Sequence, residues 1–170
     1  MAGLPVYTSR NVKVAFYSNN LDGFAPDSFV TFTRNSDVTE MEVGADGKVS
    51  KSFLPDRTGS CTISLQQQSA GNLYLSGLMN LQDTSGVLVE GSISITDDDS
   101  GSVIAKLSNC HIMTSPEISL GSSAAGTTRD WVFHCDEMWF LTAAEIISDE
   151  GAVVAQVTAA IDDVRSALGL

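Results

Sequence analysis

The sequence has few basic residues. Nine Lys and Arg stand against 21 Asp and Glu, which gives a formal net charge of −12 at pH 7. Tight binding to nucleic acid needs a cluster of positive charge, and anionic lipid surfaces attract basic segments. The composition therefore argues against proteins that bind nucleic acid or a membrane surface.

Charge of either sign is also scarce, at 18% of residues, while hydrophobic residues make up 43%. The polar surface must be built largely from Ser, Thr, Asn, Gln and Gly, which are less costly to desolvate than Lys and Glu. Such a surface favours a protein that buries much of itself against neighbours. The length of 170 residues fits one domain, and we predict a single domain over residues 1–170.

Long apolar runs are missing as well. None approaches the roughly 20 residues that a membrane helix needs, and residues 1–5 lack the pattern of a signal peptide. We therefore expect a protein that is synthesised in a host cytoplasm and stays soluble, with no membrane partner.

The sequence lacks a recognisable catalytic or metal-binding motif. It has no Gly-x-Ser-x-Gly elbow, no phosphate-binding loop and no dinucleotide-binding glycine pattern. Cysteine and histidine are neighbours at residues 110–111 and again at 134–135. Neighbours on a strand point to opposite faces, so such a pair cannot easily share one ion. We predict a non-enzyme with no cofactor and no metal site, whose three cysteines are buried thiols.

The sequence does contain apolar and polar residues in alternation, which predicts strands. The alternating segments are residues 11–18, 29–34, 38–43, 49–53, 59–66, 87–95, 103–113 and 131–142. Asp46-Gly47 between two of them predicts a hairpin turn. A change of phase near Ser108 and Asn109 predicts a β-bulge.

Two segments have the spacing of helices. Ser69 is a good N-cap for a short central helix over residues 69–81. An apolar stripe predicts an amphipathic C-terminal helix over residues 151–170, which we expect to pack on a sheet or a neighbouring subunit. The stripe consists of Val153, Val154, Val157, Ile161, Val164 and Leu168.

Five motifs between residues 32 and 78 resemble those of a known family. They are Thr33-Arg34-Asn35, Val43-Gly44-Ala45-Asp46-Gly47-Lys48-Val49, Asp56-Arg57-Thr58-Gly59, Thr62-Ile63-Ser64-Leu65-Gln66-Gln67 and Asn72-Leu73-Tyr74-Leu75-Ser76-Gly77-Leu78. In order and spacing they resemble the tail tube proteins of phages with contractile tails. Over residues 87–141 only the strand pattern agrees.

The resemblance implies a mostly β fold, a two-sheet β-sandwich or half-barrel with a flanking helix. It implies homohexameric rings whose inner sheets join into one β-barrel, and rings that stack into a hollow tube in the virion tail. The implied partners are further copies of the chain and the sheath, tape-measure and baseplate proteins. DNA would pass through during genome ejection as unbound cargo.

The resemblance also marks an assembly loop over residues 44–57, because long loops of tube subunits typically reach a neighbouring subunit or ring. Its marked residues are Gly44, Ala45, Asp46, Gly47, Lys48, Asp56 and Arg57. We expect Arg57 to pair with acidic groups on a neighbour.

The lumen candidates are polar residues on strands whose opposite faces are apolar. They are Thr31, Thr33, Glu40, Glu42, Ser60, Thr62, Ser64 and Gln66. The same pattern suits a solvent-facing outer sheet, so both placements stay open. The net charge predicts a net-negative lumen that does not bind DNA.

Two alternatives remain open. An inner-tube subunit of a contractile injection or secretion system would share the architecture but carry no DNA. A lectin-like β-sandwich would instead bind a ligand through Trp131 and Trp139.

Because the sequence predicts neither a structural metal nor a disulfide, a chelator and a reductant should each leave the melting temperature unchanged. Circular dichroism melts of the purified protein with and without each reagent check this. A drop of many degrees with either reagent would contradict the prediction.

Overall fold

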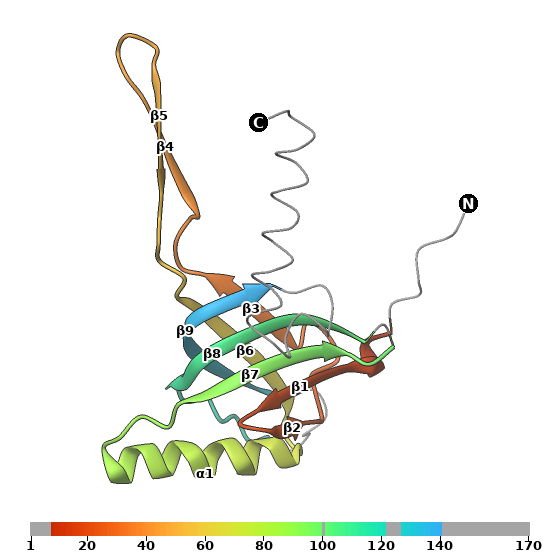
Figure 1. The fold of residues 1–170 in the computed structure, drawn as a ribbon. Helices are drawn as coiled ribbons and strands as arrows, with labels where there is room; N and C mark the ends of the chain where they lie inside the picture. Colours follow the sequence, from red (N-terminus) through yellow and green to blue (C-terminus); the bar gives the residue numbers. More distant parts are fainter. Residues whose placement is uncertain (1–7, 100, 122–126, 141–170) are drawn as a thin grey trace, which may run out of the picture.

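The computed structural model describes residues 8–99, 101–121 and 127–140. Within these residues the fold is mostly β, as the alternation predicts, with two sheets and the helix α1 (Figure 1). Across the larger sheet, neighbouring strands run antiparallel in the order β2 Asn19–Leu21, β1 Val12–Phe16, β7 Gly91–Asp97, β8 Ser102–Thr114, β9 Thr128–Phe140, β6 Gly59–Gln66 and β3 Val30–Arg34. A short 3-10 helix, η1 Ser9–Asn11, precedes β1. The predicted C-terminal helix over residues 151–170 lies outside the described residues.

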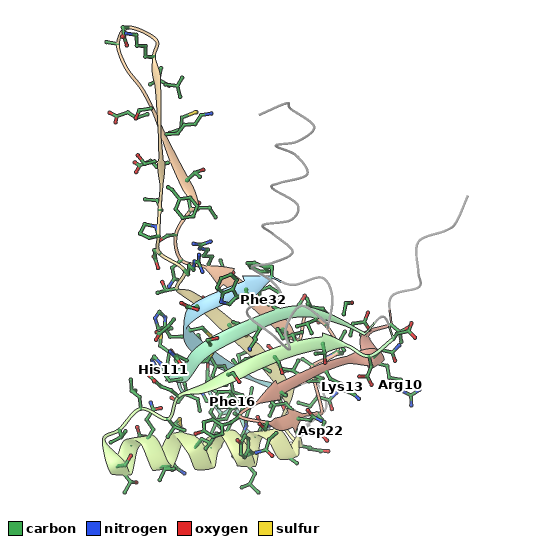
Figure 2. The ribbon with its side chains drawn as sticks, in the orientation of Figure 1. Arg10, Lys13, Phe16, Asp22, Phe32 and His111 are labelled. Atoms are coloured by element: carbon green, nitrogen blue, oxygen red, sulfur yellow. The ribbon has the colours of Figure 1, made fainter. Side chains whose placement is uncertain are left out.

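The seven-stranded sheet curls into a half-barrel around one core. β7 and β8 separate β1 from β9 in the sheet, yet the rings of Phe16 in β1 and Phe133 in β9 have centroids 5.1 Å apart. Such a contact requires the sheet to fold back on itself. The helix α1 Ala70–Ser85 lies across one end of the sheet (Figures 1 and 2). Its Leu75 is part of the same core.

Strand alternation supplies this core, because successive side chains point to opposite faces. β6 buries every second residue. β8 changes phase, since Leu107 is buried and the next buried residue is Cys110. Asn109 between them has a φ of 50°, and the register with β7 shifts between Gly91 and Ile93. The predicted bulge near Ser108 and Asn109 is therefore confirmed.

Two element boundaries differ most from the prediction. The central helix is capped by Ser69 as expected but continues to Ser85, where Gly86 ends it in the left-handed conformation with a φ of 65°. The apolar spacing stops earlier than this C-cap, so the spacing alone underestimates the length. The strand predicted from residue 87 begins only at Gly91, because the chain needs the intervening residues to return from the helix to the sheet.

β4 Thr39–Val43 and β5 Val49–Phe53 form the second sheet, a hairpin that projects from the end of the half-barrel opposite α1 (Figure 1). Gly47 has a φ of 80°, and the Gly44 N–H donates to the Lys48 carbonyl at 2.8 Å. The predicted turn is confirmed. The segment over residues 44–57 is not one long loop, because residues 49–53 pair with β4 across their full length.

None of the described helices is long and apolar enough to span a membrane.

A buried amide joins α1 to the core. Asn72 is 4% exposed, and its Nδ2 donates to the Gln66 carbonyl at 2.7 Å. Its Oδ1 accepts a hydrogen bond of 2.9 Å from Nε1 of the fully buried Trp131. The amide therefore satisfies the indole N–H and ties the start of the helix to β6 and β9.

Replacing Asn72→Ala should lower the free energy of unfolding by about 2 kcal/mol, because the indole N–H loses its acceptor inside the core. Asn80→Ala is the matched control, since Asn80 is exposed on the same helix and its loss should cost less than about 0.5 kcal/mol. Urea denaturation of the three proteins measures the difference. Equal stabilities of the two variants would contradict the role of Asn72.

Candidate functional site

The projecting hairpin exposes an apolar face. In its register, Met41 pairs with Lys51, Val43 with Val49 and Thr39 with Phe53, so their side chains share one face. On that face Met41, Val43, Val49 and Phe53 are 65, 58, 52 and 67% exposed. Isolated two-stranded hairpins are at best marginally stable in water. An exposed apolar hairpin of this kind is therefore expected to be covered by another molecule.

The other face of the hairpin is polar. Glu40 pairs with Ser52 and Glu42 with Ser50. The two glutamates, predicted as lumen candidates, thus lie on the hairpin and not on the seven-stranded sheet. The tip residues Gly44, Ala45, Asp46, Gly47 and Lys48 are all exposed, and Lys48 pairs with Asp46 at 3.5 Å.

Asp56 organises the base of the hairpin. Its carboxylate accepts hydrogen bonds from the Ser36 hydroxyl and, at 2.9 Å, from the Thr58 N–H, while its carbonyl accepts from the Arg34 guanidinium. The bond from Ser36, followed by that from Thr58, lowers the pKa of Asp56 from 3.8 to about 2. The network links the segments that enter and leave the hairpin, so it sets how the hairpin leaves the sheet.

Arg57 has a partner within its own chain. Its guanidinium carbon lies 4.5 Å from the centroid of the Trp139 ring, a cation–π geometry. The expected pairing of Arg57 with a neighbour's acidic groups stays a prediction. Trp139 in turn donates from Nε1 to Glu137 at 3.2 Å. These contacts add a second anchor at the hairpin base.

Six of the predicted lumen candidates lie together on one polar face, the outer face of β3, β6 and β9. They are Thr31, Thr33, Ser60, Thr62, Ser64 and Gln66, all exposed or half-buried. Cross-strand pairing makes them neighbours, with Thr31 opposite Thr62 and Thr33 opposite Ser60. We call this surface the polar face.

The polar face extends beyond the six predicted residues. On β9, Asp130 pairs with Ser64 and accepts a hydrogen bond of 2.6 Å from its hydroxyl. His134 pairs with Ser60 on one side and with His111 of β8 on the other. Alternation from the apolar Trp131 predicts that Asp130 and His134 face away from the core, so this signal was available. The partnership with His111 depends on the pairing of β8 with β9, which the sequence does not reveal.

The aromatic residues of β9 divide into two groups. Trp131 and Phe133 are fully buried, whereas Trp139 and Phe140 are 40 and 60% exposed. A lectin-like site that uses Trp131 and Trp139 together is therefore wrong, because the Trp131 ring is enclosed in the core. The Phe140 ring packs against Phe32 of β3 in a tilted arrangement, with ring centroids 5.5 Å apart.

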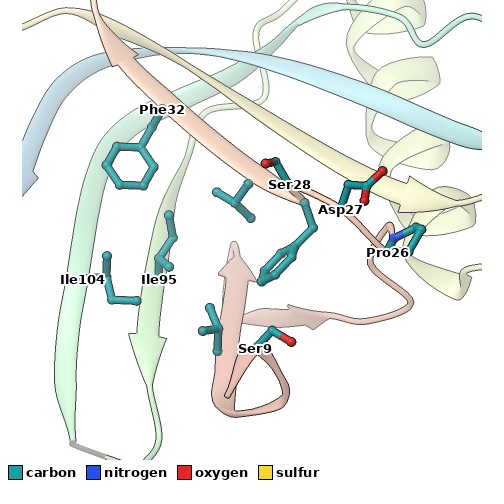
Figure 3. A pocket seen from close by; sticks show the side chains of 10 residues that line it. Ser9, Pro26, Asp27, Ser28, Phe32, Ile95 and Ile104 are labelled. Atoms are coloured by element: carbon teal, nitrogen blue, oxygen red, sulfur yellow. The ribbon is translucent and has the colours of Figure 1, made fainter. Parts of the chain in front are cut away.

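A groove of about 420 Å³ opens between β3 and the strands β1, β7 and β8 (Figure 3). Val12, Phe32, Ile95 and Ile104 are among the apolar side chains that line it. Asp27 lies on its rim, where Figure 3 shows it beside Pro26. One carboxylate beside an apolar wall gives the groove no pair of groups for acid–base chemistry.

The cysteines are inert in this environment. Cys61, Cys110 and Cys135 are free thiols with no exposed surface. Burial raises the pKa of Cys61 to about 12. A hydrogen bond with Cys110, together with burial, raises the pKa of Cys135. Enclosed thiols with a raised pKa, such as those of Cys61 and Cys135, are poor nucleophiles. Over the described part of the chain, no three His, Cys, Asp or Glu side chains gather as metal ligands.

The comparisons with known proteins agree with this architecture. The family model described as "Bacteriophage PhiTE tail tube protein" matches residues 8–141. No curated protein matches the chain. Among solved structures, the cap of the anti-feeding prophage is similar with a TM-score of 0.55 and 15% identity, over 84% of this chain and 95% of that one. A chain of the sheath–tube complex of the extracellular contractile injection system PVC has a TM-score of 0.53 and 15% identity, over 83% and 93%. At this identity the two structures show a shared fold.

Hydrogen bonds to ionised Asp56 should hold the hairpin base together from neutral pH down to about pH 3. Because the pKa is depressed, this contribution is present above 3.8 and is lost as the pH falls through about 2. An NMR titration of the Asp56 carboxyl and the Thr58 amide should give a midpoint near 2. Ser36→Ala should move the midpoint towards 3.8, since Ser36 is the largest cause of the shift. A wild-type midpoint near 3.8 would refute the network.

Proposed function

The chain belongs to the bacteriophage PhiTE tail tube protein family and is thus a structural component of a tail, and from that premise we propose that six copies form a ring and that rings stack into a hollow tube. DNA passes through this tube during ejection. The observation that carries the proposal is the exposed apolar face of the hairpin. A second copy of the chain supplies the cover that this face lacks.

Hairpin geometry supports contact between copies. The ribbon projects from the end of the half-barrel opposite α1 (Figure 1). Its base is anchored by Asp56 and by Arg57 on Trp139. An anchored ribbon loses less conformational freedom on docking than a flexible loop does. The hairpin tip, with Asp46 and Lys48, then lies against an adjacent subunit or ring.

The edges of the large sheet support ring closure. β2 and β3 are its edge strands. β3 reads Val-Thr-Phe-Thr-Arg and carries neither the lysine nor the proline that commonly protects an exposed edge. Pairing of edges between neighbouring copies would remove these edges and join the sheets of the ring into one barrel.

The polar face is our candidate for the wall of the lumen. Hydroxyl and amide side chains dominate it, and Asp130 contributes a carboxylate. A wall without clustered Lys and Arg offers DNA no array of phosphate contacts, so DNA slides past it. The glutamates Glu40 and Glu42 add negative charge on the hairpin.

Sheath, tape-measure and baseplate proteins are the proposed partners besides the chain itself. The similar PVC chain comes from a sheath–tube complex, which supports a sheath partner. The same likeness keeps a second candidate open, an inner tube of an injection system that carries no DNA. Neighbouring genes for capsid and terminase proteins would favour the phage tail, and their absence would favour the injection system.

Replacing three of the four apolar residues on the hairpin face should abolish tubes and leave the half-barrel folded. In the triple variant Met41→Ser, Val43→Ser and Val49→Ser, negative-stain micrographs should show no tubes under conditions in which the wild type assembles. The matched control is Glu40→Gln with Glu42→Gln, which changes only the opposite face and should still assemble. Circular dichroism verifies the fold of each variant. Normal tubes from the triple variant would overturn the role of the hairpin.

Assembly should respond to salt, because each subunit carries a net charge of −12. Screening shortens the reach of repulsion to about 8–10 Å near physiological ionic strength. Tubes should therefore form more readily as salt rises from low to moderate levels, as sedimentation can measure. Assembled tubes should not retain labelled DNA at low salt, and measurable retention would count against a non-adhesive lumen.

A further inference from the structure

Two imidazoles lie side by side on the polar face. His111 of β8 is the cross-strand partner of His134 of β9, and their ring centroids are 5.6 Å apart with an interplanar angle of 61°. Both residues are half-buried. Figure 2 labels His111 on its strand. We propose that His111 and His134 form a binding site for a divalent transition-metal ion such as Zn²⁺.

The strand register separates these imidazoles from the thiols. Cys110 and Cys135 are also cross-strand partners, but they have no exposed surface and lie on the core face of the same two strands. Because neighbours on a strand point to opposite faces, the sheet stands between thiol and imidazole. A cysteine and its neighbouring histidine therefore cannot bind one ion together. The two histidines remain as a pair of imidazole ligands, and only the pairing of β8 with β9 brings them together.

The ring separation fits a shared ion. Zinc–nitrogen bonds of about 2.0–2.1 Å place the metal about 3.2 Å from each ring centroid. Centroids 5.6 Å apart then subtend roughly 120° at the metal, close to the tetrahedral angle of zinc. The rings reach this arrangement by rotation about χ2, which is a soft torsion in histidine.

One imidazole nitrogen lacks a hydrogen-bond partner. Nδ1 of His111 is buried and has no hydrogen-bond partner among the described residues. A buried polar atom without a partner is costly. Because Nδ1 makes no hydrogen bond, none is lost there when the His111 ring rotates about χ2. The unpartnered nitrogen therefore favours the rearrangement that a shared ion requires.

The site has an open coordination sphere. Within the described residues no third His, Cys, Asp or Glu joins the pair, so water fills the remaining positions. A two-imidazole site of this kind binds an exchangeable ion and does not replace the core as the source of stability. The ion would tie β8 to β9 beside the bulge at Asn109.

Cobalt provides the direct test, because Co²⁺ takes zinc sites and reports its ligands by absorption. Untagged protein titrated with Co²⁺ should bind one ion per chain and show visible d–d bands without the near-ultraviolet band of cobalt–thiolate bonds. Zn²⁺ should displace the cobalt, and the d–d bands should then disappear.

His134→Gln should weaken Co²⁺ binding by at least about tenfold, since one of two protein ligands is removed. His111→Gln should do the same and is interpreted only if its circular dichroism matches the wild type. Ser60→Ala is the control, because Ser60 pairs with His134 on its other side and supplies no imidazole. Absence of binding at millimolar Co²⁺, a thiolate band, or binding that survives both histidine substitutions would each overturn the proposal. The test uses subunits in solution and does not depend on tube formation.

Discussion

Contact between strands that are not neighbours in the sheet holds this structure in its shape. Phe16 of β1 meets Phe133 of β9 across the interior, and Trp131 beside it is fixed by the amide of Asn72 on α1. A tilted pair of aromatic rings stabilises the fold beyond the contribution of the apolar area that it buries. Without this packing the sheet would lose its curl, because strand pairing alone does not bring β1 and β9 together.

The curvature of the sheet determines which side chains are exposed to solvent. Once one face of every strand in the large sheet is turned into a single core, the alternate residues form a mostly polar surface over β3, β6, β9 and the end of β8, on which Val132 is an apolar exception. The hairpin β4–β5 has no such core to enter, so its apolar side chains stay exposed. A subunit with a packed core and an exposed apolar ribbon fits one that associates with other molecules. The same logic places His111 against His134 and keeps the thiols enclosed.

Local signals predicted much of this fold. Alternation gave β6 nearly residue by residue, Ser69 marked the start of α1, and Asp46-Gly47 marked the hairpin turn. The polar face was predicted in part, through Thr31, Thr33 and the even-numbered residues of β6. Contacts between segments distant in the sequence could not be predicted. Alternation shows that a strand is amphipathic, but it does not show which other element covers the apolar side of that strand. Three features depend on which strands pair in the fold. They are the exposure of the hairpin, the burial of Trp131 but not of Trp139, and the pairing of the two histidines.

The most direct measurement is a helical cryo-EM reconstruction of the assembled protein. We expect six-fold rings in which Met41, Val43 and Val49 of each hairpin are buried against another copy. It also predicts that the polar face, with Thr62 and Asp130, lines the lumen. A tube whose hairpins stand free in solvent, or whose contacts leave those three side chains uncovered, would contradict the central claim that the hairpin holds the copies together.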